Sequence, residues 1–232
     1  TIYRETGMTG EAIAQYREIL ALKPADRTVL SELTKCYLKS EQYDEVVRTA
    51  SLAVREDPQD AAALVDRAFA WGQLGNWEKA IASYQAALRV QQDDPVVVFK
   101  LGEAYEKTGQ LAKAASQYKR GLEKVPKADH VALALADLSL KMGNLDETIR
   151  WHREVVRRDP KNAVAYANLG LAYGGKGQTK EEIDSYRRAI ELDPKNPVVH
   201  FNLGVAYEKA KREADAVREY KRVLELKPDD RD

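Results

Sequence analysis

The chain has 232 residues, of which 44% are hydrophobic and 32% are charged, enough apolar material for a substantial core beneath a hydrated surface. Lysine and arginine number 37, as do aspartate and glutamate, so the formal net charge is zero and we expect no nucleic-acid partner. No apolar stretch approaches the roughly 20 residues that span a bilayer, so we expect no membrane insertion. The single cysteine, Cys36, excludes an internal disulfide, and its apolar helical surroundings indicate a buried, inert thiol.

Prolines recur along the chain at intervals of 34 residues or a multiple of 34, and proline ends a helix. Gln92 fills the one vacant place in the series. Glycines midway between the prolines repeat with the same step and predict that each unit breaks into two helices. The prolines are Pro24, Pro58, Pro126, Pro160, Pro194 and Pro228, and the glycines are Gly75, Gly109, Gly143 and Gly177.

In chain order, residues 1–26 are predicted to be the tail of an earlier unit, with Tyr3, Ala12 and Tyr16 in register. Complete two-helix units are predicted at 27–60, 61–94, 95–128, 129–162, 163–196 and 197–230. Within the units, apolar residues spaced by three, four and seven positions form one stripe along a helix. Because one hairpin cannot bury its apolar stripe alone, neighbouring units must stack.

The last unit shows the pattern clearly: Leu203, Gly204 and Tyr207 are followed by Ala216 and Tyr220. This pattern resembles the tetratricopeptide repeat family, W-x2-L-G-x2-Y, then A-x3-F, then P, and the resemblance covers essentially the whole chain. It implies an all-α fold, a right-handed superhelix (solenoid) of 34-residue helix-turn-helix repeats forming one domain over residues 1–232. Small residues at repeat positions eight and twenty are expected to let two helix backbones approach closely, as at Gly102, Gly170, Gly204, Ala80 and Ala114.

Unit 163–196 departs from this pattern. Glu182 replaces the small residue at position twenty, Thr179 replaces a large residue at position seventeen, and Gly174 and Gly175 weaken the end of the first helix. A carboxylate at a close crossing is costly unless it pairs or reaches solvent. We expect this unit to bend, to fray or to accept a ligand backbone near the glycines, and a loosely packed repeat is the alternative.

A search for catalytic and metal-binding motifs gives no candidate. His130, His152 and His200 occupy different repeat positions, without metal-ligand spacing, and His152 is interpreted as a core histidine with a local partner. No nucleophile elbow is present, and the glycine run at 174–177 lacks the spacing and the preceding strand of a phosphate loop. We therefore expect no catalytic residue, metal or cofactor, and no enzymatic activity.

The family resemblance implies that the first helices of the repeats line a concave groove. Repeat positions two, five, six and nine of these helices are unusually apolar, and part of this surface, especially position five, is expected to pack between adjacent units. In related proteins, asparagines at position six bind the backbone of an extended peptide, and inherited repeat consensus is the alternative explanation for those found here. The predicted partner-binding residues are Phe69, Phe99, Lys100, Asp137, Leu140, Asn168, Leu171, Asn202 and Val205.

A second candidate surface is a ladder of basic residues at position twenty-five. Such residues commonly pair with acids one helical turn away, so we interpret them as a solvated face, with an anionic-partner patch as the alternative. The residues are Arg17, Lys119, Arg153, Arg187 and Lys221.

Together these observations predict a protein–protein interaction scaffold that binds a peptide or helix of a partner in its groove. The alternatives are a substrate-recruiting repeat segment of a larger enzyme and an assembly module of a bacterial envelope or secretion complex. The last helix carries Tyr220, Val223 and Leu224 without a following hairpin, so we expect end-to-end self-association, with fraying as the alternative. The sequence does not distinguish cytoplasm from periplasm.

Overall fold

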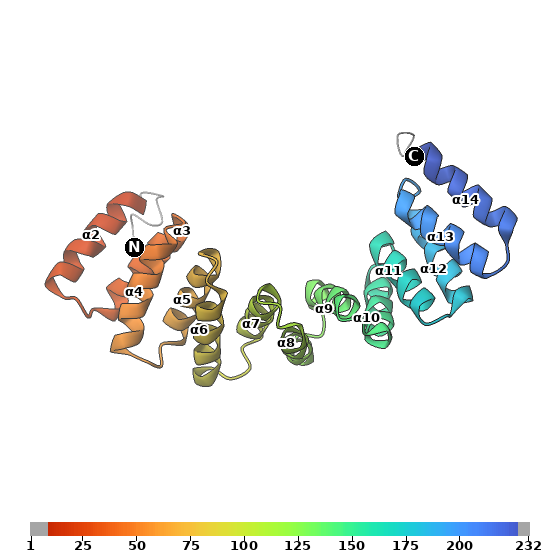
Figure 1. The fold of residues 1–232 in the computed structure, drawn as a ribbon. Helices are drawn as coiled ribbons and strands as arrows, with labels where there is room; N and C mark the ends of the chain where they lie inside the picture. Colours follow the sequence, from red (N-terminus) through yellow and green to blue (C-terminus); the bar gives the residue numbers. More distant parts are fainter. Residues whose placement is uncertain (1–8, 227–232) are drawn as a thin grey trace. The chain divides into compact units, whose positions relative to one another are not determined.

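The computed structural model describes residues 9–226, which form thirteen α-helices and, within that range, no strand (Figure 1). This confirms the predicted all-α class. Tyr3 and Pro228 lie outside the described residues. The helices are α2 (Thr9–Leu22), α3 (Arg27–Lys39), α4 (Tyr43–Glu56), α5 (Ala61–Gln73), α6 (Trp77–Val90), α7 (Pro95–Lys107), α8 (Leu111–Lys124), α9 (Asp129–Lys141), α10 (Leu145–Arg158), α11 (Ala163–Gly175), α12 (Thr179–Leu192), α13 (Pro197–Lys209) and α14 (Glu213–Leu226).

The chain divides into two compact units, Thr1–Pro126 and Lys127–Asp232, which we call the N-terminal unit and the C-terminal unit and describe separately. Within each unit, helices pack mainly against the helices before and after them in the chain (Figure 1). The first helices of adjacent repeats also contact one another, as α3 does α5 and α11 does α13. One continuous solenoid over residues 1–232 stays a prediction.

The turn inside each complete repeat depends on a residue with left-handed backbone at position fifteen. Four of these residues are the predicted glycines, Gly75, Gly109, Gly143 and Gly177, with φ between 69° and 76°. Glu41 and Lys211 occupy the same position with φ of 57° and 58°. A single left-handed residue stops the first helix and satisfies its last carbonyls, so the chain reverses and the second helix packs back on the first.

The turns between repeats are fixed by an acid or amide at position thirty-four. Its side-chain oxygen accepts a hydrogen bond from the backbone N–H of the third residue of the next helix. This cap occurs at Asp26, Asp60, Asp94, Asn162 and Asn196.

The turn that lacks proline, at Gln92, is built differently. Asp93 adopts φ of 61°, and Arg120 Nε donates to its carboxylate at 2.9 Å. Lys124 Nζ lies 3.5 Å from the other carboxylate oxygen. Two cations of α8 thus hold a backbone conformation that non-glycine residues rarely adopt.

Each hairpin is closed by a contact between repeat positions eight and twenty-four. A Cβ atom added at Gly102 would lie 2.5 Å from the Tyr118 ring, and one added at Gly170 would lie 2.6 Å from the Tyr186 ring. The prediction of a small residue at a close approach is therefore right, but the group that approaches is a tyrosine ring and not the partner helix backbone. The reverse arrangement occurs in repeat 27–60, where Thr34 faces helix α4 and position twenty-four is Ala50; both residues are buried.

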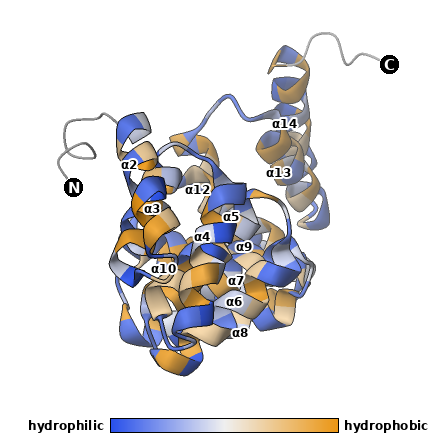
Figure 2. Ribbon diagram, turned by 90° about the vertical axis from the view of Figure 1, so that its left-hand side faces the viewer, coloured by the Kyte–Doolittle hydropathy of each residue, from blue (hydrophilic) through white to orange (hydrophobic). Residues whose placement is uncertain are grey.

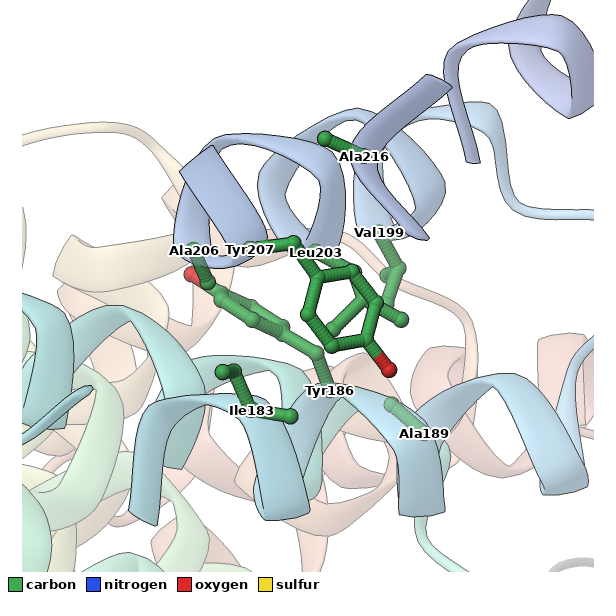
Figure 3. Packing of buried hydrophobic residues seen from close by; sticks show 8 residues of the cluster. All are labelled: Ile183, Tyr186, Ala189, Val199, Leu203, Ala206, Tyr207 and Ala216. Atoms are coloured by element: carbon green, nitrogen blue, oxygen red, sulfur yellow. The ribbon is translucent and has the colours of Figure 1, made fainter. Parts of the chain in front are cut away.

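The buried stripes of successive hairpins pack against one another in several apolar clusters within each unit. Figure 3 shows one of these clusters in the C-terminal unit, where Tyr186 and Ile183 of α12 face Val199, Leu203 and Tyr207 of α13. Figure 2 shows hydrophobic and hydrophilic residues on different sides of the same helices, as the predicted stripe requires. Cys36 is buried and is not in a disulfide, as predicted.

The irregular repeat 163–196 is not loosened by its departures. Glu182 is only 3% exposed, and its carboxylate pairs with Lys209 Nζ at 3.1 Å. A Cβ atom at Gly174 would lie 2.4 Å from Glu182 Oε1, so the glycine makes room for the carboxylate; Gly175 in turn packs against Leu145. Helix α11 runs without interruption to Gly175, which is exposed, and a ligand backbone near these glycines stays a prediction.

Candidate partner-binding surface

The first helices of the C-terminal unit present an exposed apolar surface. Val164 and Val198, both at repeat position two, are 63% and 62% exposed, and Leu171 at position nine is 49% exposed. Apolar side chains with this exposure, gathered on adjacent helices, are typical of a partner-binding site.

These side chains border a pocket between α11 and α13, which we call the α11–α13 pocket. It has a volume of about 340 Å³, in the range of sites that hold one or a few side chains. Its lining is mostly aliphatic with several amide side chains, and it includes Ala189 from the end of α12 and the exposed Asp193 from the turn that follows. Two of the predicted site residues of α11, Asn168 and Leu171, and Asn202 of α13 line it together.

Asn168 is held by a polar cluster on its other side. The His152 ring is fully buried, and its Nδ1 lies 3.0 Å from the carbonyl oxygen of Thr148, one turn earlier on α10. Asn168 Nδ2 lies 3.0 Å from His152 Nε2 and 3.4 Å from the Asp137 carboxylate. The local partner predicted for His152 is therefore the Thr148 carbonyl, and Asn168 of the next repeat is a second partner that the sequence pattern did not reveal.

Asp137 and Leu140 lie on α9, at the side of this cluster away from α13. Both are half-buried, and neither lines the α11–α13 pocket. Val205 on α13 is also half-buried and outside the pocket lining. The structure thus gathers three of the predicted site residues at one pocket and joins Asp137 to it only through Asn168.

The predicted site residues of the N-terminal unit have different surroundings. Phe69 is half-buried and packs edge-on against Tyr43, with ring centroids 6.1 Å apart. Lys100 Nζ donates to Glu103 at 2.8 Å within its own helix. This part of the first-helix surface is therefore occupied by internal aromatic packing and by an ion pair.

Position five was expected to pack between adjacent units. Ala167, which packs against the core between α12 and α13, and Leu133, which packs against a cluster containing Ala165 of the next repeat, do so. The two phenylalanines at this position make a different contact. A Cβ atom at Gly121 would lie 1.9 Å from the Phe99 ring, so Phe99 packs on the second helix of its own hairpin. Phe201 likewise lies 5.8 Å from the Tyr220 ring of its own hairpin, centroid to centroid. Both rings therefore contact the second helix of their own hairpin.

A carboxylate in the N-terminal unit carries a perturbed pKa. Asp66, at the same repeat position as Asn168 and Asn202, is half-buried, and burial raises its pKa to about 6 against the opposing effect of Lys35. Asp60 adds to the rise. An ionised side chain is therefore unfavourable at this place in the first-helix surface.

His200 is nearly buried between two acceptors. Its Nδ1 lies 2.7 Å from a Glu219 carboxylate oxygen, and its Nε2 lies 3.2 Å from the carbonyl oxygen of Pro194. Among residues 9–226, no group of three or more His, Cys, Asp or Glu side chains is placed to hold a metal ion. In the same range no helix has the length and apolar character needed to cross a membrane.

The basic ladder at position twenty-five is solvent-exposed at each of its five members. Arginines elsewhere on the second helices do pair with acids about one turn away, as Arg157 does with Glu154. These pairs fit the interpretation of a solvated face.

The fold is that of a helical-hairpin repeat protein. Its two-helix hairpins stack, each turns at a left-handed residue at position fifteen, and in several of them a small residue faces a tyrosine ring. The chain belongs to the tetratricopeptide repeat family. A family model described as the tetratricopeptide repeat protein 21 C-terminal ARM domain matches residues 53–231, and a tetratricopeptide repeat model matches residues 3–70.

Solved structures give the same result for the fold. MamA from Desulfovibrio magneticus RS-1, from residue 41 to its end, matches with a TM-score of 0.65 and 23% identity over 74% of this chain and 97% of that one. MamA AMB-1 matches with a TM-score of 0.67 and 25% identity, over 75% and 94%. YrrB, described as a TPR protein with an unusual peptide-binding site, matches with a TM-score of 0.68 and 18% identity, over 78% and 93%.

Proposed function

We propose that this chain is a non-catalytic protein-interaction scaffold that binds an extended peptide segment of a partner protein at the α11–α13 pocket. Proteins of the tetratricopeptide repeat family typically act as non-catalytic scaffolds, and this supports the general part of the proposal. The observation that carries the specific part is the pocket itself, where exposed Val164, Val198 and Leu171 lie beside three amide side chains, those of Asn168, Asn196 and Asn202.

The chemistry of the rim favours an extended segment over a helix. A helix satisfies its own backbone hydrogen bonds, whereas an extended peptide presents unpaired N–H and C=O groups that amides such as Asn168 and Asn202 can bind. A pocket of about 340 Å³ has room for one or two aliphatic side chains of such a segment. The partner segment is therefore expected to combine aliphatic anchors with an accessible backbone.

The test is selection of peptides from a phage-displayed library on the purified protein, followed by titration calorimetry. Val198→Glu should weaken a selected peptide by about tenfold or more, because it places a charge in the apolar wall. Val96→Glu is the matched control, since Val96 has the same repeat position and is also 63% exposed but lies on α7 of the N-terminal unit. Equal losses in the two variants, or selection of no peptide at all, would contradict the proposed site.

A further inference from the structure

We infer that His152 is a positioning residue that fixes the Asn168 side-chain amide with its nitrogen turned inward, so that Asn168 offers the α11–α13 pocket a hydrogen-bond acceptor only. The inference deepens the proposed function, because it states what a partner must present at this position: a donor, such as a backbone N–H. Its structural part concerns the free protein alone.

The tautomer of His152 follows from its fixed neighbour. The Thr148 carbonyl oxygen can only accept a hydrogen bond, so the ring nitrogen 3.0 Å from it, Nδ1, carries the proton. In the neutral ring Nε2 is then an acceptor, and it requires a donor. Asn168 Nδ2, 3.0 Å away, is the group that supplies one.

The second N–H of Asn168 is used as well. Asp137 Oδ1 lies 3.4 Å from Asn168 Nδ2, so both hydrogens of the amide are directed to α9 and α10. The amide oxygen, Oδ1, is left as the polar atom that Asn168 can offer to a ligand in the pocket that it lines. Asn202 also lines the pocket, and among residues 9–226 it has no such pair of acceptors, so it remains able to donate and to accept.

Protonation of His152 should reverse this arrangement. A proton on Nε2 makes it a donor that faces the Asn168 nitrogen, and the amide must rotate to turn its oxygen inward. Asp137 of α9, with an oxygen 3.5 Å from Nε2, is the charged group that contacts the ring among the described residues. Helix α11 contributes the neutral Asn168, and α10 contributes the Thr148 carbonyl. In acid, Asn168 would therefore present a donor to the pocket.

The other repeats of the chain suggest a substitution that tests this inference. Position twenty-four is tyrosine in four other repeats, and in repeat 61–94 Tyr84 packs with Ala68 at position eight, the same residue type as Ala136 opposite His152. His152→Tyr therefore has a precedent for folding, and it removes the Nε2 acceptor. Asn202 serves as the internal reference amide.

The experiment is ¹⁵N nuclear magnetic resonance of the free protein at pH 8. We expect the Nδ1–H tautomer of His152, a through-hydrogen-bond coupling between Nε2 and Asn168 Nδ2, and exchange of the Asn168 side-chain protons about five- to tenfold slower than that of Asn202. In His152→Tyr the coupling disappears and the two asparagines exchange alike. On acidification the Asn168 resonances should move with the same midpoint as the His152 ring.

An Nε2–H tautomer at pH 8, or Asn168 protons that exchange as fast as those of Asn202 in the wild type, would overturn the inference. Neither result depends on the fold of a variant or on a partner. For a selected peptide, N-methylation of the backbone nitrogen that meets Asn168 should lower affinity at pH 8. A peptide that binds while tolerating N-methylation at every position would refute the donor requirement, whereas the absence of any binding peptide counts against the proposed function alone.

Discussion

The first helices of the two units share one backbone pattern and differ in the chemistry they display. At repeat position six the N-terminal unit carries Glu32, Asp66 and Lys100, whereas the C-terminal unit carries Ala134, Asn168 and Asn202. At position nine the N-terminal unit carries Lys35, Phe69 and Glu103, and the C-terminal unit carries Asp137, Leu171 and Val205, one charged residue in place of two. Because these positions do not close the hairpin, they vary without altering it. The hairpin contact of positions eight and twenty-four occurs in both units, so the differences at positions six and nine change the surface without removing that contact.

The largest expected effect tests whether the hairpin contact is in fact equivalent in the two units. Gly102→Leu and Gly170→Leu each drive a side chain into a buried tyrosine ring, and each should cost about 3 kcal/mol. Urea denaturation followed by circular dichroism measures both. Gly102→Leu combined with Tyr118→Ala should recover part of the loss. Repeat 27–60 already has this arrangement, with the larger residue, Thr34, at position eight and the smaller one, Ala50, at position twenty-four. A loss in one unit only would show that their cores differ.

The next prediction concerns the ion pair between the buried Glu182 and Lys209 in the C-terminal unit. Lys209→Met leaves the buried Glu182 carboxylate without its cation and should cost about 2 kcal/mol, since Lys209 is itself partly exposed. The double variant with Glu182→Ala restores the residue type of Ala80 and Ala114 and should be close to the wild type. If the single variant were as stable as the wild type in thermal unfolding, the ion pair would contribute nothing to the contact between repeats.

The third prediction concerns the replacement of Asp66 in the N-terminal unit by asparagine, the residue that the C-terminal unit has twice at the same repeat position. The pKa of Asp66 is raised from 3.8 to about 6, which corresponds to about 3 kcal/mol at most, and partial exposure reduces this to about 1–2 kcal/mol. Because the folded state binds the proton more tightly, stability falls as pH rises from 4 to 6 and then stays low. Asp66→Asn, the residue type of the C-terminal unit, should remove this dependence and stabilise the protein at pH 7.

Denaturation at pH 4 and pH 7.5 checks this prediction, with Asp44→Asn on the exposed side of α4 as the control. A wild-type protein whose unfolding free energy does not fall across this range would contradict it.

The smallest expected effect is a difference in melting temperature between alanine variants of Asn168 and Asn202. Asn202→Ala should leave the melting temperature unchanged, whereas Asn168→Ala removes the donor to His152 Nε2 and should cost about 1 kcal/mol. The sequence alone predicts no change for either, because position six points away from the hairpin core. Equal melting temperatures for the two variants would show that the His152 contact has no net energetic value.

The 34-residue spacing of proline and glycine was sufficient to predict the helices and their turns. These residues end helices, and the small and large residues at positions eight and twenty-four close each hairpin, through contacts within one repeat. The sequence also places Asn168, Leu171 and Asn202 on one surface, and the structure brings them to one pocket. It could not reveal the link between His152 and Asn168, since this joins two repeats through side chains sixteen positions apart. Nor could it show that Phe99 and Phe201 contact the second helices of their own hairpins, which depends on Gly121 and Tyr220.

The buried Glu182 constrains how this chain can evolve by copying its repeats. A repeat that carries this carboxylate needs a cation at position thirteen of whatever repeat follows it, which Lys209 provides. A tandem duplication of 163–196 would instead place Gly175 there and bury an unpaired charge. This repeat can therefore be followed by a repeat with a lysine at position thirteen, such as those that carry Lys39, Lys107, Lys141 or Lys209, but not by a copy of itself.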